Sequence, residues 1–182
     1  IVKEKIRNQR DNLKRFKCKN FKLLDEYISQ VEINDISNRE GHAAKVYFNA
    51  LFGLDFTRTE DNSTNAALNY GYSLLLSAFN RCITSNGYMT QIGLFHDNMF
   101  NPFNLASDLM EPFRPIVDRK VKEMNPTKFE HDEKMEVISI LQNEVVINGR
   151  SEFVNNAIKI YCKSIFDAIN DEDISEIRFY KL

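Results

Sequence analysis

Residues 63–87 decide the expected fold, and they read STNAALNYGYSLLLSAFNRCITSNG. Ser63 or Thr64 can cap a helix, because a side-chain oxygen there accepts a hydrogen bond from a free backbone N–H. Asn86-Gly87 can end the helix, since both residues tolerate the left-handed conformation. Small and apolar residues recur between these points at helical spacing; they are Ala67, Tyr70, Leu74, Ala78 and Cys82. The stretch therefore predicts one long helix with a single inner face.

The rest of the chain also favours helices, because only 6 Gly and 4 Pro interrupt 182 residues. Further helices are expected over 1–17, over 21–31, from a cap at Asp35 or Ser37 to about 52, from Asn104 to about 121 with interruptions at Pro112 and Pro115, over 132–143, and from a cap at Ser151 to about 170. Residues 88–95 can be extended, Asn148-Gly149 favours a small hairpin near 144–150, and residues 174–182 alternate like an edge strand. We expect an all-α, multi-helix fold with at most one small hairpin.

The composition is that of a globular protein with one core, since 43% of residues are hydrophobic and 27% are charged. No apolar run approaches the ~20 residues of a membrane span, and the first residues contain no signal-peptide core. The three separated cysteines suggest neither a zinc site nor a disulfide framework. We therefore expect a cytoplasmic protein. Residue 1 is Ile rather than Met, which indicates a fragment or a processed chain.

Positive charge is concentrated at the start of the chain. Residues 1–22 contain nine Lys and Arg against two acidic residues, a net charge of +7, although the whole chain carries −2. A basic arm of this kind can follow a phosphate backbone, and Lys14, Arg15 and Lys17 are its candidate DNA contacts. The alternative is an ordinary solvated helix face.

Glu40 is the first candidate for chemistry. It shares a helical stripe with Tyr47 and Leu51, so its carboxylate should point toward the interior. A buried anion costs several kcal/mol unless it is paired or bound to a metal. The alternatives are an ion pair with Arg39 or Lys45, or simple exposure.

Two later segments carry further candidates. His96 ends an apolar stretch and can ligate a metal if a nearby acid orients its second ring nitrogen; the alternative is a structural histidine. Asp108 and Glu111 lie i, i+3 and should share one helix face, where two carboxylates repel unless a cation lies between them. The alternative for Glu111 is an ion pair with Arg114, one turn further on. Carboxylates combined with one imidazole suit Mg²⁺ or Mn²⁺.

Four blocks of sequence carry a resemblance to a known family. They are Arg39-Glu40-Gly41-His42-Ala43-Ala44-Lys45-Val46-Tyr47-Phe48, Asn65-Ala66-Ala67-Leu68-Asn69-Tyr70-Gly71-Tyr72, Gly93-Leu94-Phe95-His96 and Asp108-Leu109-Met110-Glu111-Pro112-Phe113-Arg114-Pro115. In this order they resemble the blocks of the CRISPR adaptation integrase, the first CRISPR-associated (Cas) protein, in a version like that of type II systems. The resemblance covers residues from about 30 to 170.

The resemblance implies a helical catalytic domain in which Glu40, His96 and Glu111 hold Mg²⁺ or Mn²⁺. Asp108 matches an additional acid near that site, and Tyr70 matches a tyrosine close to the DNA end. Many relatives have Asp where this chain has Glu111. The implied organisation is a basic helical arm or linker over 1–30, leading from a missing N-terminal β-rich domain, followed by the catalytic domain over 31–182.

The resemblance also implies a reaction and partners. A 3′-hydroxyl of incoming spacer DNA attacks a phosphodiester at the edge of a CRISPR repeat, a transesterification that serves antiviral defence; with water as the nucleophile, the same site is a nuclease. The expected partners are DNA, a small ferredoxin-like CRISPR-associated protein and, in the full-length family, a second copy of the chain.

Two other interpretations remain open from the residues. His96-Asp97 with an upstream His42 also fits the HD pair of a metal phosphohydrolase, although this leaves Glu40 and Glu111 without a role. The chain can also be a non-enzymatic helical module that binds DNA through its basic arm.

Overall fold

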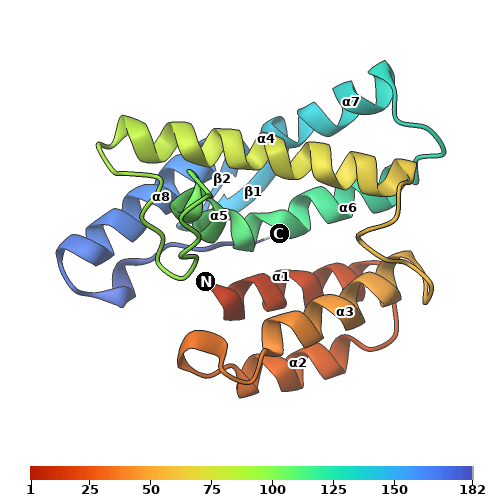
Figure 1. Cartoon of the computed structure of the whole chain (residues 1–182), viewed down its shortest axis with the longest axis horizontal. Helices are drawn as coiled ribbons and strands as arrows, with labels where there is room; N and C mark the ends of the chain where they lie inside the picture. The colour runs from red at the N-terminus through yellow and green to blue at the C-terminus, as the bar shows by residue number, and fades with distance from the viewer. Residues whose placement is uncertain (182) are drawn as a thin grey trace. The chain divides into compact units, whose positions relative to one another are not determined.

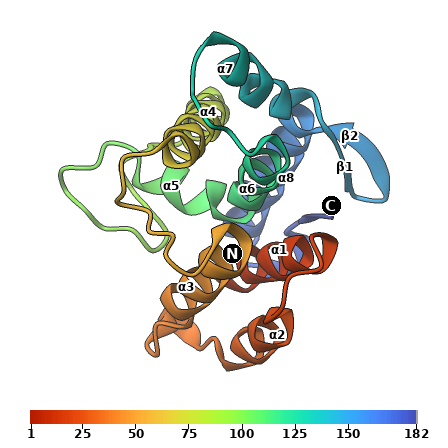
Figure 2. The same ribbon diagram turned by 90° about the vertical axis from the view of Figure 1, so that its right-hand side faces the viewer.

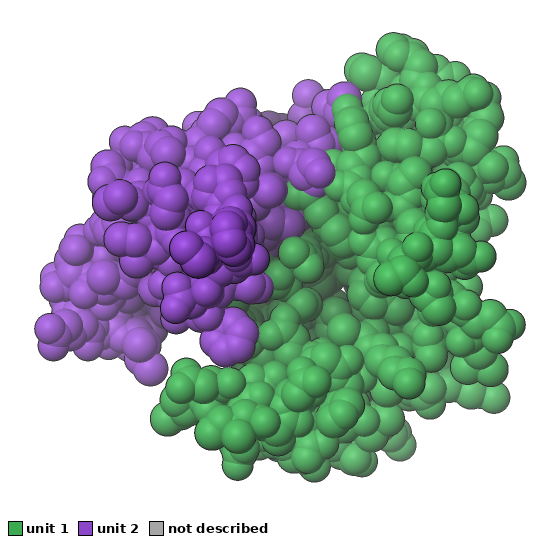
Figure 3. All heavy atoms as spheres, viewed as in Figure 1, with its two compact units in different colours: residues 1–72, 111–137 green, residues 73–110, 138–182 purple. Residues whose placement is uncertain are grey.

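The computed structural model describes residues 1–181 and is mostly helical, as expected (Figure 1). The chain forms two compact units, coloured separately in Figure 3. Unit 1 comprises Ile1–Tyr72 and Glu111–Val137, and unit 2 comprises Ser73–Met110 and the residues from Ile138 onward. The long predicted helix, α4, spans Ser63–Ser85 and contributes to both units.

Unit 1 is built around three helices that lie side by side in Figures 1 and 2. The elements of unit 1 are α1 (Val2–Arg15), α2 (Phe21–Gln30), η1 (Ile33–Asp35), α3 (Arg39–Phe52), the start of α4, η2 (Glu111–Phe113), α6 (Arg114–Met124) and α7 (His131–Ile138). The first three α-helices enclose an apolar core made of Ile6, Leu13, Leu24, Ala43, Tyr47 and Leu51. Residues 1–30, the expected basic arm, lie within this unit.

Helix α1 also buries a row of polar side chains. Asn8 donates to the carbonyl oxygen of Pro112 at 3.0 Å, and Asn12 donates to that of Pro115 at 2.7 Å. The guanidinium of Arg119 in turn donates to Asn12 at 2.9 Å. Buried amides stabilise a fold only when they are paired, so these bonds fix α1 against η2 and α6.

Asp118 on α6 is a buried acid with a phenol as its partner. The hydroxyl of Tyr72 donates to its carboxylate at 2.5 Å. Burial raises the pKa of Asp118 from 3.8 to about 6, although the hydrogen bonds from Tyr72 and Tyr47 oppose that shift. Keeping the carboxylate of Asp118 charged in the folded protein therefore costs free energy.

Unit 2 contains the rest of α4 and a small sheet. Its other elements are α5 (Asn104–Met110), η3 (Ser139–Gln142), β1 (Glu144–Ile147), β2 (Arg150–Phe153), α8 (Val154–Asn170), η4 (Ile174–Glu176) and β3 (Tyr180–Lys181). The strand order is β2-β1-β3 and both pairings are antiparallel. Asn148 and Gly149 both have positive φ, 52° and 74°, which is the conformation of a two-residue hairpin turn. The predicted hairpin is confirmed.

Several local predictions were wrong. Residues 88–95 form turns and loop rather than an extended segment, because the backbone N–H groups of Leu94 and Phe95 bind a carboxylate instead of a neighbouring strand. Ser151 lies inside β2, so it does not cap α8. The oxygen that caps the start of α4 belongs to Asn62, which accepts from the N–H of Asn65 at 2.8 Å.

The end of the chain completes the sheet. The expected edge strand is short, and it pairs through Tyr180 with Ile147 of β1; residue 182 lies outside the described residues. The three cysteines carry free thiols. Within residues 1–181, no helix is long and apolar enough to span a membrane.

Candidate catalytic site

Glu40 and Glu111 share one cation in unit 1. The Lys5 ammonium lies 2.6 Å from Oε1 of Glu40 and 2.5 Å from Oε2 of Glu111. The side chains of Lys5 and Glu111 are only 10% and 8% exposed, and that of Glu40 is 24% exposed. Arg114 adds a second cation at 3.1 Å from Glu111. The two expected carboxylates are therefore gathered around one positive charge.

The local fold places Glu40 in the first turn of α3. Both carboxylate oxygens of Asp35 accept backbone N–H groups at the start of that helix, from Arg39 and Glu40, each at 2.9 Å. Asp35, one of the two expected caps, thus satisfies donors that would otherwise be free. An acidic side chain is also favoured at this end by the helix dipole.

The charges in this cluster compensate one another. Burial alone would lower the pKa of Lys5, but the charges of Glu111 and Glu40 outweigh it, so its pKa is raised and the ammonium stays protonated. Glu111 also forms the predicted alternative ion pair with Arg114. Glu40 pairs with neither Arg39 nor Lys45, which were the alternatives expected from its neighbours in sequence.

His96 and Asp108 form the second arrangement, in unit 2. Nδ1 of His96 lies 2.5 Å from Oδ1 of Asp108, whose side chain is 3% exposed, whereas the imidazole is 43% exposed. The backbone N–H groups of Leu94, Phe95 and His96 donate to the same carboxylate at 2.6, 2.9 and 3.2 Å. A carboxylate on Nδ1 fixes the tautomer and leaves Nε2 available.

Gly93 allows this loop to close over Asp108. A Cβ at position 93 would lie 2.3 Å from the carbonyl oxygen of His96 and 2.8 Å from Oδ2 of Asp108. Real Cβ atoms do not approach backbone oxygen so closely, so only glycine fits without moving the loop. Gly93 belongs to the third family block, but its packing role was not predicted.

The structure identifies the acid that contacts the histidine ring. The partner of His96 is Asp108, twelve residues further on, and not the adjacent Asp97, which is exposed. His42, the upstream ligand of the HD interpretation, is an exposed residue beside the ring of Tyr27.

Lys5 was missed as a site residue. The available signal was the polar row of α1, because Lys5, Asn8, Gln9 and Asn12 recur at helical spacing and all are buried. A lysine on the inner face of a helix requires a carboxylate partner. The sequence does not indicate which one.

The candidate DNA contacts lie on the surface of unit 1 with different surroundings. Arg15 pairs with Glu123 at 3.3 Å, and Lys14 lies over the ring of Phe21. Lys17 is exposed, and half-buried Tyr70 packs edge-on against Phe129.

The donor atoms suit a hard divalent cation. Oε2 of Glu111 is buried and has no hydrogen bond of good geometry, although the ammonium of Lys5 lies close to it. Two carboxylates around one cation are the oxygen ligands that Mg²⁺ and Mn²⁺ take. Among residues 1–181, no three acidic, His or Cys side chains form a ready metal-binding group. The residues of unit 1 nevertheless fit such an ion in their chemistry.

The comparisons with known proteins identify the family. The sequence profile described as "CRISPR associated protein Cas1" matches residues 1–145. The chain belongs to the Cas1 family. A Cas1 endonuclease from Neisseria meningitidis is 49% identical over 100 residues, which is 55% of this chain and 33% of the relative. A Cas1 endonuclease from Francisella tularensis is 30% identical over 91% of this chain and 59% of the relative.

Solved structures show the same fold. A Cas1 protein from Thermotoga maritima superposes with a TM-score of 0.76 at 20% identity, over 95% of this chain and 66% of that one. A casposase bound to integration product gives a TM-score of 0.75 at 22% identity, over 94% and 62%. The chain therefore has the helical fold found in Cas1 proteins, and it spans about a third to two thirds of the relatives it matches.

Proposed function

We propose that this chain is a metal-dependent DNA endonuclease and integrase that inserts spacer DNA into a CRISPR array by transesterification. The observation that carries the proposal is the pair of carboxylates, Glu40 and Glu111, gathered around the ammonium of Lys5. Membership of the Cas1 family supports it, as does the likeness to a casposase whose structure holds an integration product.

Glu40, Glu111 and His96 are proposed to hold Mg²⁺ or Mn²⁺. The ion, when bound, supplies a Lewis acid beside the scissile phosphodiester. Asp108, the additional acid, holds Nδ1 of His96 and so presents Nε2 of the ring. In this proposal Asp108 orients His96, which is the ligand, and does not itself bind the metal.

Lys5 and Arg114 have a second role in this proposal. Both are cations beside Glu111, and phosphoryl transfer requires positive charge next to the oxygens on which negative charge accumulates. Once the two carboxylates have another cation, the Lys5 ammonium is free to bind a phosphate oxygen. We therefore propose Lys5 as a phosphate-binding residue of the loaded site.

The remaining contacts concern DNA and partners. We propose that Lys14, Arg15 and Lys17 bind phosphates and that Tyr70 lies near the DNA end. Two similar solved structures are Cas6-RT-Cas1–Cas2 complexes, which supports a small ferredoxin-like partner. Two staggered strand attacks need two active sites, so complete insertion requires a dimeric assembly.

Replacement of one carboxylate tests the chemistry. Glu40→Gln keeps the size of the side chain but removes the charge, so metal-dependent cleavage of a labelled duplex should fall by about 10²–10³-fold, as for other groups that stabilise transition-state charge. The matched control is Glu26→Gln, an exposed position on α2, which should retain the wild-type rate. Both proteins are assayed with Mn²⁺ and with EDTA.

Three results would contradict the proposal. Undiminished cleavage by Glu40→Gln would exclude the carboxylate from the site. Equal rates with Mn²⁺ and EDTA would exclude a metal. Salt-sensitive DNA binding without any metal-dependent cleavage would favour the non-enzymatic DNA-binding module instead.

A further inference from the structure

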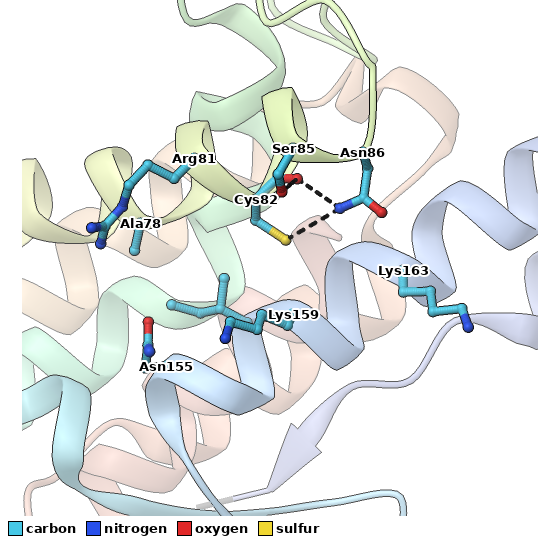
Figure 4. A pocket seen from close by; sticks show the side chains of 9 residues that line it. Ala78, Arg81, Cys82, Ser85, Asn86, Asn155, Lys159 and Lys163 are labelled. Atoms are coloured by element: carbon cyan, nitrogen blue, oxygen red, sulfur yellow. Dashed lines mark hydrogen bonds between the residues drawn. The ribbon is translucent and has the colours of Figure 1, made fainter.

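A groove in unit 2 lies outside every residue discussed so far as catalytic. It runs between α4 and α8, and its volume is about 510 Å³. Figure 4 shows Arg81 and Cys82 on α4, Asn86 directly after that helix, and Lys159 and Lys163 on α8. No acidic residue lines it.

The three cations of this groove are not compensated by the protein. Among the described residues, no carboxylate forms an ion pair with Arg81, Lys159 or Lys163, and all three are exposed. Lys159 and Lys163 lie i, i+4 on one face of α8, where like charges destabilise a helix. An anion in the groove would therefore find three cations that, within residues 1–181, have no ion-pair partner to give up.

The spacing of the cations indicates an extended anion. Lys159 and Lys163 are separated by about 6 Å along the helix axis, and a DNA strand carries one phosphate per ~3.4 Å of duplex axis. The two lysines are thus placed one turn apart along α8, a spacing that suits an anion with several phosphates along its length. Asn155 also lines the groove and adds an amide donor, whereas the amide nitrogen of Asn86 donates to the carbonyl oxygen of Cys82 at 2.7 Å.

We propose that this groove binds the phosphate backbone of duplex DNA through Arg81, Lys159 and Lys163, as a contact surface separate from the catalytic residues. The proposal rests on the function proposed above only in taking DNA as the polyanion. It predicts a contribution to binding that depends on salt and not on base sequence, because phosphates carry no sequence information.

The test is a triple variant, Arg81→Gln, Lys159→Gln and Lys163→Gln, in the full 182-residue chain. Anisotropy of a labelled duplex is measured in EDTA at several salt concentrations between 50 and 200 mM. The slope of log affinity against log salt should fall by ~0.9 per lost phosphate contact, or about 2.7 for three. Affinity at low salt should fall by at least about tenfold, equally for two unrelated duplex sequences.

The control variant removes the same formal charge elsewhere. Lys128→Gln, Lys134→Gln and Lys181→Gln replace exposed lysines that do not line the groove, and their slope should stay near the wild-type value. An equal loss in both triple variants would overturn the proposal, since only net charge would then matter. An unchanged slope in the groove variant would also overturn it and leave an acidic protein partner as the occupant to test.

Two further measurements keep the result interpretable. Each groove substitution is also made singly, and each should lower the slope by ~0.9, so a folding defect in the triple variant does not decide the outcome. Glu40→Gln should keep the full slope while losing cleavage. Retained cleavage in Glu40→Gln with a groove-dependent slope would refute only the proposed function, and a wild-type chain without salt-dependent DNA binding would refute both.

Discussion

Asp108 and Glu111 are three residues apart, and each buries a carboxylate, but by different means. Glu111 lies between two cations, Lys5 and Arg114. Asp108 accepts hydrogen bonds from three backbone N–H groups, and its carboxylate also contacts the ring of His96. The predicted shared face of one helix is not used in this way, because α5 ends at Met110 and each acid has partners within its own unit.

The difference indicates that Glu111 can exchange its partner cations, whereas Asp108 holds a loop in place. Side-chain cations can leave a carboxylate when another cation arrives, whereas backbone amides are fixed by the path of the chain. The loop held by Asp108 has little apolar burial of its own, since six large side chains remain exposed: Met89, Ile92, Leu94, Phe95, Met99 and Phe100. The amide contacts therefore determine where His96 lies.

The largest expected effect is at the shared cation. Lys5→Met leaves two carboxylates facing each other at a mostly buried position, which should cost about 3 kcal/mol of unfolding free energy. The melting temperature should fall by roughly 6–12 °C, as expected for a chain of this size. Adding Mn²⁺ should restore much of this loss, as measured by thermal unfolding with and without EDTA. A shift of under about 2 °C, or no response to Mn²⁺, would contradict the view that Glu111 depends on cations that can be exchanged.

Asp118 provides a third way to bury a carboxylate, with phenols as partners. Its folded-state pKa of about 6 exceeds the usual 3.8, so its contribution to stability is full below about pH 3.8 and is lost as the pH rises through 6. Asp118→Asn removes this titration. Relative to the wild type, the unfolding free energy of the variant should therefore rise by about 2–3 kcal/mol between pH 4 and pH 7.5.

Denaturant titrations of both proteins across that pH range measure the difference. A constant offset between variant and wild type would mean that burial does not disfavour the charged form of Asp118. That result would mean that phenol partners compensate the charge of a buried carboxylate as fully as cations do.

The smallest of the three effects is local. Asp108→Asn weakens charged hydrogen bonds to the loop by about 1.5–2 kcal/mol. The amides of Leu94 and Phe95 should then exchange hydrogen roughly 10–30-fold faster, with little change in α8. Asp97→Asn is the matched control, because Asp97 is exposed in the same loop. Equal protection in both variants would show that the loop does not depend on Asp108.

The sequence predicted which face of a helix a residue lies on better than it predicted which residue it contacts. The stripe of Glu40, Tyr47 and Leu51 correctly placed the Glu40 carboxylate toward the interior, because helical periodicity alone determines a face. It could not identify Lys5, which lies 35 residues earlier in another helix. For the same reason the tail and the hairpin near 144–150 were both recognised, but the pairing of the tail with β1 of that hairpin was not predicted.

The family blocks predicted which residues belong to the candidate site, but not the contacts that those residues make. Those blocks selected His96 and Asp108, but they did not reveal that the acid holds the loop through three backbone amides. Such contacts depend on how a loop folds, and no periodic pattern encodes them. Gly93 was the available signal, since a glycine beside a functional residue often marks a close backbone approach.

The polar row of α1 has a consequence for the order in which the protein is made. Asn8 and Asn12 are synthesised well before the carbonyl oxygens they bind, on Pro112 and Pro115, which follow 104 and 103 residues later. At a synthesis rate of about 5–20 residues per second, α1 waits about 5–20 s on the ribosome for these partners. During that time its inner face carries amides that only water or a chaperone can satisfy. Helix α1 is thus fixed in place only after η2 and the start of α6 have been synthesised, and translation arrested before Pro115 leaves a chain with that face open.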